Sequence, residues 1–356
     1  MTVRPAEIRV RLSPQERFDV IDVTRIISEE FGDFLSRYKR ALYCSYHTTA
    51  GYLEQSLCAR LNHCPDSLHT FVKGFRRLFP PNANYRHDEL HLRDELSEEQ
   101  KACEPRNADS HLTYIGSGLK NCVTYLNPNQ TPVYWIDLDG VYQSQRRRRT
   151  TSVIGFSSEQ IVSKRRFAVP VSKHPVDSIS LKDPRLGLFE MLRDEMQRLG
   201  LEKGRIRISL DSGERHAGLT MNEYETLLMK HDLAEVLCNP FQFMAEKGKN
   251  MWRDPLAIPN KTLNYAKYDM VQVFNGLVDV LGISDTMLER LVDRLLTVTA
   301  SRFLRMERCV NLPVGDSGRP GRGEIMEGTY QSPILMQWNK SEGRKRSLEV
   351  TFVRFV

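Results

Sequence analysis

The chain has 356 residues, of which 40% are hydrophobic and 27% charged, which favours two soluble domains with real cores. The net charge of +6 suits anionic substrates but is too small to argue for nucleic acid by itself. The seven cysteines include no Cys-x-x-Cys pair, residues 1–12 contain no signal-peptide core, and no run of about 18 apolar residues occurs. We therefore expect a cytoplasmic protein with reduced thiols and no membrane span.

The first half of the chain predicts a mixture of strands and helices. Alternating or short apolar runs predict strands at residues 8–12, 18–23, 41–43, 119–126, 133–138 and 146–156. Apolar faces at helical spacing predict helices at residues 24–35, 53–61 and 68–78. Thr24 is placed to cap the first of these helices, and Pro80 stops the third. The polar residues 82–107 predict a long loop with one short helix.

The second half predicts a similar order of elements. Strands are expected at residues 167–171, 205–210 and 348–355, and a helix that starts at Pro184 and ends before Gly200 lies between the first two. Further helices are expected at 268–281 and from a Ser284 cap onward. They belong to a helical insertion at about residues 238–308.

Polar positions also recur between the halves. Residues 50–51 and residues 217–218 are both Ala-Gly. When the two halves are aligned at these residues, Glu214 aligns with His47. The basic segment 343–346 likewise repeats the run of arginines at 146–149. We therefore predict an internal duplication, with copies at residues 1–160 and 161–356. The alternative is that two α+β domains share a common order of strands and helices by chance.

Three histidine segments stand out in the first copy. His47 opens a His-Thr-Thr-Ala turn between a predicted strand and a predicted helix, where hydroxyl and N–H groups can face an anion. His87 lies in the Tyr-Arg-His-Asp segment at residues 85–88, and His111 lies in the Asn-Ala-Asp-Ser-His-Leu segment at residues 107–112. These histidines are far apart in sequence, so only folding can bring them together.

The three histidine segments are followed by Asp139-Gly140 and a basic closing strand. Segments of this kind, in this order, resemble the YjbQ-like family, also called secondary thiamine-phosphate synthase. That family has an Asn-Glu pair after its His-Thr-Thr-Ala turn, and a Gly-Thr-Trp-Gln strand. The first copy has Gln55-Ser56 at the pair and lacks the strand motif at residues 131–135. The second copy keeps Asn222-Glu223 and has Gly-Thr-Tyr-Gln at residues 328–331, but it lacks the three histidines.

The resemblance implies an α+β fold made of two tandem YjbQ-like sheet-plus-helix domains, the second degenerate. Family members are implied to be trimers with a histidine cluster that can hold a metal. The activity attached to the family joins a pyrimidine diphosphate to a thiazole phosphate. We therefore expect a homo-oligomer, with a trimer as the form that the family suggests.

The imidazoles of His47, His87 and His111 make a good zinc site with one coordination position open. Such a metal ion can lower the pKa of a bound water or stabilise a departing phosphate. A structural role remains the alternative for each histidine taken singly, and His91 is the alternative ligand closest to His87.

Other polar residues are candidates for catalysis or substrate binding. Asn107 or Asp109 could orient an imidazole, although a turn or helix cap is the alternative for Asp109. The predicted catalytic residues are His47, Asn107, Asp109 and Glu223. The predicted substrate-binding residues are Thr48, Thr49, Arg86, Arg106, Asn222 and Gln331. Asn222, Glu223 and Gln331 come from the second copy and would complete a site made by both copies. The alternative is that the second copy has lost its function and serves only as a scaffold.

The sequence therefore predicts a metal-dependent enzyme, with zinc as the metal, acting on a small phosphorylated molecule with pyrophosphate as the leaving group. The alternatives are a hydrolase that uses zinc-bound hydroxide on a phosphorylated or acyl substrate, and a non-catalytic binding or scaffold protein. Nucleic acid is not an expected partner, because the four arginines at 146–149 alternate between the two faces of a strand.

Overall fold

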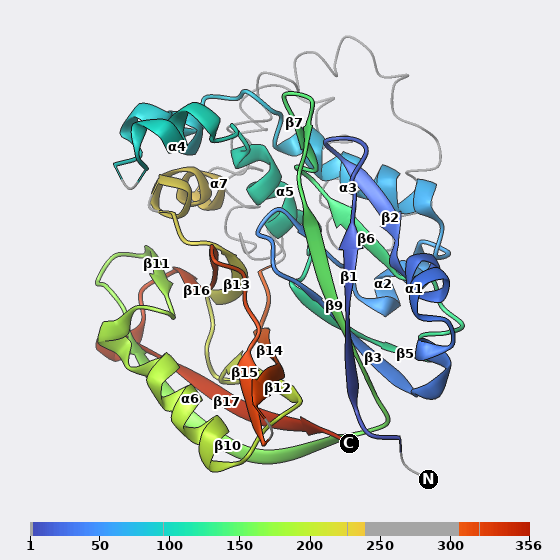
Figure 1. Ribbon diagram of the computed structural model, residues 1–356. Helices are drawn as coiled ribbons and strands as arrows, with labels where there is room; N and C mark the ends of the chain where they lie inside the picture. Colours follow the sequence, from blue (N-terminus) through green and yellow to red (C-terminus); the bar gives the residue numbers. More distant parts are fainter. Residues whose placement is uncertain (1–2, 95, 226, 239–305, 320) are drawn as a thin grey trace.

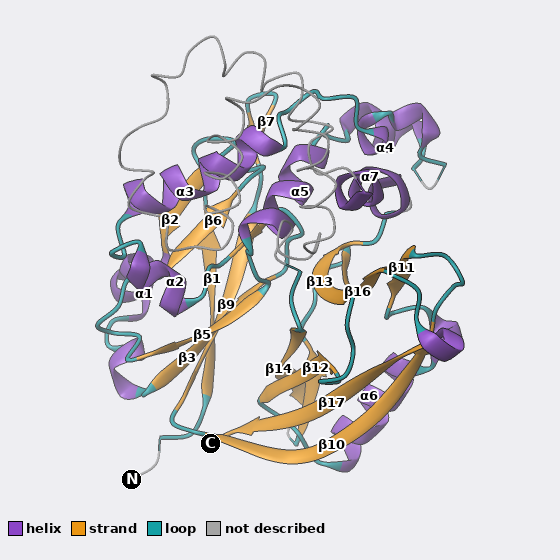
Figure 2. Ribbon diagram, turned by 180° about the vertical axis from the view of Figure 1, so that it is seen from behind, coloured by secondary structure: helices purple, strands orange, loops and turns teal. Residues whose placement is uncertain are grey.

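The computed structural model describes residues 3–94, 96–225, 227–238, 306–319 and 321–356. The helices predicted at 268–281 and after Ser284 lie outside the described residues, as does most of the insertion predicted at 238–308. The described chain is a mixed α+β protein in which strands from the two halves of the sequence form separate sheets (Figures 1 and 2). Among the described helices, none is both long enough and apolar enough to cross a membrane.

The first half contains two antiparallel sheets and a short hairpin. The larger sheet has the order β1-β9-β3-β5, with bounds Ala6–Leu12, Arg149–Phe156, Arg40–Ser45 and Cys122–Leu126. The smaller sheet has the order β2-β6-β4, with bounds Asp19–Asp22, Tyr134–Asp137 and Ala50–Gly51. The hairpin pairs β7 (Val141–Tyr142) with β8 (Gln145–Arg146). The helices are α1 (Val23–Phe31), α2 (Gln55–Arg60), α3 (Pro65–Leu78), α4 (Glu98–Cys103) and α5 (Ala108–Ser117).

The second half also contains two antiparallel sheets. The larger has the order β10-β17-β12-β14-β15, with bounds Glu159–Pro170, Lys345–Phe355, Gly204–Leu210, Cys309–Arg319 and Arg322–Ile325. The smaller has the order β11-β16-β13, with bounds Val176–Ser180, Gln331–Trp338 and Ala217–Glu223. The described helices of this half include α6 (Leu188–Arg198) and α7 (Leu233–Cys238).

Strand order and register are the same in the two halves, apart from the added edge strand β15. The pairs Leu12–Arg149, Tyr43–Val153, Cys44–Cys122 and Ala50–Asp137 have counterparts in Val169–Arg346, Ile208–Val350, Ser209–Cys309 and Ala217–Gln337. Because a one-residue slip would turn every side chain of a strand to the other face, equal register puts corresponding residues in corresponding environments. Arg346 thus corresponds to Arg149, and Gln337 to Asp137.

The start and end of α1 differ from the sequence prediction. The side chain of Asp22, not Thr24, caps the helix by accepting the Arg25 N–H at 3.0 Å. The Thr24 hydroxyl instead accepts the N–H of Val133 at 2.8 Å. The chain leaves the helix at Gly32, where φ is +58°, a backbone angle that glycine adopts without strain.

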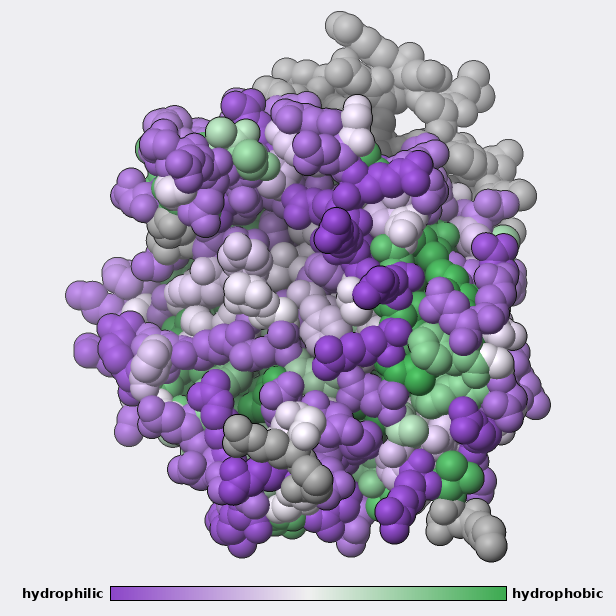
Figure 3. All heavy atoms as spheres, viewed as in Figure 1, coloured by the Kyte–Doolittle hydropathy of each residue, from purple (hydrophilic) through white to green (hydrophobic). Residues whose placement is uncertain are grey.

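The hydrophobic core runs from one half into the other. Leu228 and Leu233 from the helical segment of the second half, and Ile334 and Met336 from β16, pack in the same buried cluster as the first-half strands and helices. Charged groups also join the halves, since Lys120 Nζ lies 3.0 Å from Glu307 Oε2. The face seen in Figure 3 is largely hydrophilic, as expected when apolar side chains fill such a core.

Candidate active site between the two halves

Helix α5 (Ala108–Ser117) carries polar side chains into the interior and lies against the second half. All ten of its residues are buried. The Ala108 N–H at its start donates to Asp88 Oδ1 at 3.0 Å, and the helix ends at Gly118 in the left-handed region. A buried polar side chain needs a partner, so the contacts of α5 define the site.

The tautomer of His111 follows from its contact with the second half. His111 Nδ1 lies 2.7 Å from Asn222 Oδ1, and the same oxygen accepts the backbone N–H of Glu223 at 2.7 Å. The backbone donor identifies this atom as the amide oxygen, because an NH₂ group cannot accept a hydrogen bond. His111 therefore carries its proton on Nδ1 and keeps a lone pair on Nε2 when it is neutral.

The lone pair of His111 faces a carboxyl group from strand β13. Glu223 Oε2 lies 3.7 Å from His111 Nε2, and Glu223 Oε1 lies 3.4 Å from Arg93 Nη2. Burial raises the pKa of Glu223 and lowers the pKa of His111, so both groups favour their neutral forms. The separation exceeds a direct hydrogen bond.

His87 lies next to His111 and has its own fixed proton. Its Nδ1 lies 3.1 Å from Asp88 Oδ1, and its ring centroid lies 5.2 Å from that of His111. Burial opposes the charged imidazole, but the Asp88 carboxylate outweighs burial and raises the pKa of His87. Within the described part of the chain, His87 Nε2 is buried without a hydrogen-bond partner.

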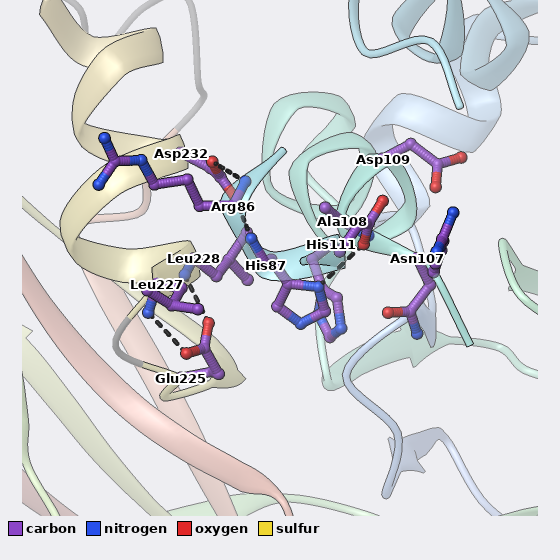
Figure 4. A network of polar contacts seen from close by, with 12 residues as sticks. Arg86, His87, Asn107, Ala108, Asp109, His111, Glu225, Leu227, Leu228 and Asp232 are labelled. Atoms are coloured by element: carbon purple, nitrogen blue, oxygen red, sulfur yellow. Dashed lines mark hydrogen bonds and ion pairs between the residues drawn. The ribbon is translucent and has the colours of Figure 1, made fainter. Parts of the chain in front are cut away.

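A helical turn of the second half holds His87 in place, as Figure 4 shows. The two carboxylate oxygens of Asp232 accept the backbone N–H groups of Arg86 and His87, each at 2.9 Å. Asp232 is the last residue of the helical segment Leu228–Asp232, which continues directly into α7, and the Glu225 carboxylate accepts the N–H groups of Leu227 and Leu228. Burial raises the pKa of Asp232 to about 6.

His47 has a different environment from the other two histidines. Its Nδ1 lies 3.2 Å from Arg149 Nη1, and its Nε2 lies 3.4 Å from the Thr150 backbone nitrogen. Arg149 is itself held by Asp137, at 2.7 Å from Nε and 2.9 Å from Nη2. Burial and the positive charges of Arg149 and Arg147 lower the pKa of His47 to about 3, so its ring is neutral at physiological pH.

Asp139 connects the two histidine environments. Its Oδ2 lies 2.9 Å from Arg147 Nη2 and accepts the side-chain N–H of Asn107 at 2.9 Å. The charge of Arg147 lowers the pKa of both His47 and His111. Polar contacts thus link the His47 turn to the start of α5 by way of Arg149, Asp139 and Asn107.

Asp109 lies in the first turn of α5. Its Oδ1 lies 2.8 Å from Arg17 Nη2, while burial raises the pKa of its carboxyl group to about 6. Asp109 Oδ2 and Asn107 Oδ1 are buried atoms without a hydrogen-bond partner among the described residues. In Figure 4 these two side chains come from the first turn of α5 and lie apart from the His87–His111 pair.

The three histidines do not fit the zinc site predicted from the sequence. His87 and His111 have protons fixed on Nδ1, as metal-binding histidines commonly do, but His47 faces a guanidinium group that would repel a metal ion. Across the described residues, no group of three His, Cys, Asp or Glu side chains lies close enough to hold a metal. Folding thus brings two predicted ligands together and leaves the third beside Arg149.

The remaining predicted residues have varied positions. Arg86 and Arg106 are exposed, and the Arg86 side chain extends away from the His87–His111 pair, with Nη1 3.4 Å from His231 Nδ1 (Figure 4). Thr48 and Thr49 are buried in the turn after His47. Gln331 fastens this turn to the second half, because its Nε2 donates to Ser45 O at 2.9 Å and to His47 O at 3.0 Å.

Arg93, Arg147 and Arg149 are site residues that the sequence analysis missed. The signal for two of them was present, because Arg147 and Arg149 are two residues apart in the strand predicted at 146–156 and would share one of its faces. In the structure β9 begins at Arg149, which is 4% exposed. Arg93 lies in a polar loop and is 2% exposed, and sequence alone gave no sign of its burial.

The solved structures to which this chain is similar include neighbours of low sequence identity. A YbjQ-like protein of unknown function from Sulfolobus solfataricus P2 is 14% identical, covering 55% of this chain and 99% of its own, with a TM-score of 0.29. A hypothetical protein from Aeropyrum pernix K1 is 14% identical over 54% and 98%, with a TM-score of 0.29. A conserved YjbQ/UPF0047-family protein from Clostridium acetobutylicum is 13% identical over 54% and 99%, with a TM-score of 0.24. No protein-family model and no curated protein matches the chain.

Proposed function

We propose that the chain is a tandem duplication, with copies at 1–160 and 161–356, whose two copies build a single active site. Equal strand order and register in the two halves support this proposal. So does the division of residues, because the first copy supplies the histidines and the second supplies Asn222 and Glu223. A copy that had decayed into a scaffold would have no need to place a carboxyl group against a histidine lone pair.

The proposed activity is acid–base catalysis on a small phosphorylated molecule, with phosphate or pyrophosphate leaving. The pairing of His111 Nε2 with Glu223 carries this proposal. In its protonated form Glu223 can donate to the departing oxygen, while His111 Nε2 accepts a proton from the attacking group. Asn222 keeps His111 in the required tautomer, and Arg147 supplies positive charge near the phosphate.

The energetic cost of the site supports a functional role. Burying an ionisable group costs several kcal/mol unless it is paired, and apolar replacements of such pairs are often more stable. Here Arg93 and the two adjacent histidines are buried together, and Glu223 lies half-buried beside them. Groups with pKa values shifted by burial and placed in contact are typical of active sites.

Transfer to a second phosphorylated molecule, as the family resemblance suggests, and hydrolysis differ only in the group that attacks. The acid–base pair serves both reactions. A zinc ion enters neither scheme, because the three predicted ligands do not meet.

The test is release of phosphate or pyrophosphate from a panel of small phosphate monoesters and diphosphates, with and without a phosphorylated acceptor. We expect Glu223→Gln to lower turnover by about 10²–10⁴-fold while leaving the thermal unfolding midpoint close to that of the wild type. The matched control is Glu104→Gln, which removes the other carboxylate beside Arg93, 3.5 Å from Nη1. Equal losses in both variants, or full turnover in Glu223→Gln, would reject the acid–base role and favour a scaffold.

A further inference from the structure

The turn that carries His47 has a counterpart in the second half. There Glu214 takes the place of His47, Arg346 that of Arg149, and Ser347 that of Thr150. Arg346 Nη1 donates to Glu214 Oε2 at 2.9 Å, and the Ser347 N–H donates to Glu214 Oε1 at 2.7 Å. A further arginine contact also corresponds, since Arg346 Nη2 donates to Asn339 O as Arg149 Nη2 donates to Asp139 O. Arg346 Nη1 additionally donates to Arg215 O at 2.8 Å.

The two halves differ in how well the same two donors are satisfied. Each half presents one guanidinium N–H and one backbone N–H to the turn residue. A carboxylate has two acceptor oxygens and satisfies both donors, as Glu214 does. A neutral imidazole has one lone pair and one N–H, so His47 can satisfy only one donor and must direct its own N–H at the other.

His47 is more exposed than its neighbours, and its ring packs edge-on against Trp135, with ring centroids 5.7 Å apart. Its side chain is partly exposed, whereas Thr48, Thr49 and Arg149 are buried. The backbone on either side is fixed, because Gln331 holds the carbonyl groups of Ser45 and His47. A rotation about the side-chain bonds of His47 would therefore expose the two donors without disturbing the turn.

We propose that an anionic oxygen of the substrate, of phosphate or carboxylate type, displaces the His47 ring and binds the Arg149 Nη1 and Thr150 N–H donors. In the second half, the Glu214 carboxylate binds the corresponding donors of Arg346 and Ser347 in place of such an anion, so no second anion can bind there. The chain binds one such anion, in the first half. This inference rests on the proposed function for the class of substrate and adds the contacts that recognise its charged end.

Titration calorimetry with inorganic phosphate as the probe tests the displacement. We expect one phosphate per chain in the wild type, with binding in His47→Ala at least as tight, because the ring no longer competes. His47→Glu places a carboxylate on the two donors, as in the second half, and we expect phosphate binding to weaken by about tenfold or more. Thermal unfolding in phosphate-free buffer checks that each variant is folded.

Weaker phosphate binding in His47→Ala would overturn the proposal, because His47 would then be a ligand of the anion. Absence of phosphate binding in the wild type would overturn it equally. If His47→Glu fails to fold, Glu214→Ala replaces it. That variant removes the carboxylate partner of Arg346, and we expect phosphate to raise its unfolding temperature more than it raises that of the wild type.

The experiments distinguish failure of the acid–base proposal from failure of the anion-binding proposal. Glu223 makes no contact with Arg149 or Thr150 among the interactions described above, so Glu223→Gln should bind phosphate as the wild type does. Normal phosphate binding with unchanged turnover in that variant would reject the acid–base pair alone.

Discussion

His111 Nε2 lies 3.7 Å from Glu223 Oε2, although the two residues belong to different halves of the chain. Asn222, the residue before Glu223, fixes the His111 tautomer through its Oδ1 at 2.7 Å. Strand β13 thus supplies both the group that orients the imidazole and the carboxyl group that faces its lone pair. The proposed site therefore depends on residues of the second half.

Changing Asn222 should alter the pH dependence of turnover. Asn222→Asp keeps an acceptor for the His111 Nδ1 proton but adds a negative charge, which raises the pKa of His111 by roughly one unit or more. Because neutral His111 is the base, the acid limb of the pH–rate profile should move to higher pH. Asn222→Ala removes the acceptor, and we expect turnover to fall about 10²-fold or more. An unmoved acid limb in Asn222→Asp would show that His111 is not the base.

Adding a single methyl group at Gly328, where the backbones of the two halves lie close together, should lower the stability of the protein. A Cβ atom at this position would lie 1.8 Å from Tyr46 O, next to His47. We expect Gly328→Ala to lower the free energy of unfolding by about 1–3 kcal/mol and to reduce turnover. Gly213→Ala is the control, because no described heavy atom lies within 4 Å of its added Cβ. Denaturant unfolding compares them, and equal stability would show that this close approach is unimportant.

The free energy of unfolding should fall at acid pH because of His47. Its pKa is lowered from an ordinary value of 6.5 to about 3 by burial and by the charges of Arg149 and Arg147. Between these values the unfolded chain binds more protons than the folded chain, so stability is present above pH 6.5 and is lost as pH falls toward 3. The slope reaches about 1.4 kcal/mol per pH unit for one such group. Denaturant unfolding of His47→Gln should give a shallower slope, and an unchanged slope would place the titration elsewhere.

Much of the fold follows from local sequence pattern, while the site depends on contacts that pattern cannot reveal. The strands at 8–12 and 205–210 alternate, and the structure confirms them as β1 and β12. Helix α5 was missed because polar residues such as Asp109 and His111 interrupt any apolar stripe, although all are buried. Their burial is possible only because partners come from distant segments, such as Arg17 for Asp109 and Asn222 for His111.

The metal content of the purified protein tests the three-histidine site that the sequence predicts. We expect much less than one zinc ion per chain after purification without chelators, because His47 contacts Arg149 instead of the His87–His111 pair. Elemental analysis of the wild type, His47→Ala and His111→Ala gives the answer. About one zinc per chain, lost in both folded variants, would restore the metal centre.

A double-mutant cycle on His111 and Glu223 tests the shared site most directly. The measurement is kcat/KM for release of phosphate from the best substrate of the panel, in His111→Gln, Glu223→Gln and the double variant. Residues that act as one unit are not additive, so we expect the double variant to be no slower than the slower single variant. If the two losses multiply, the groups act independently, and a site shared between the two halves is contradicted.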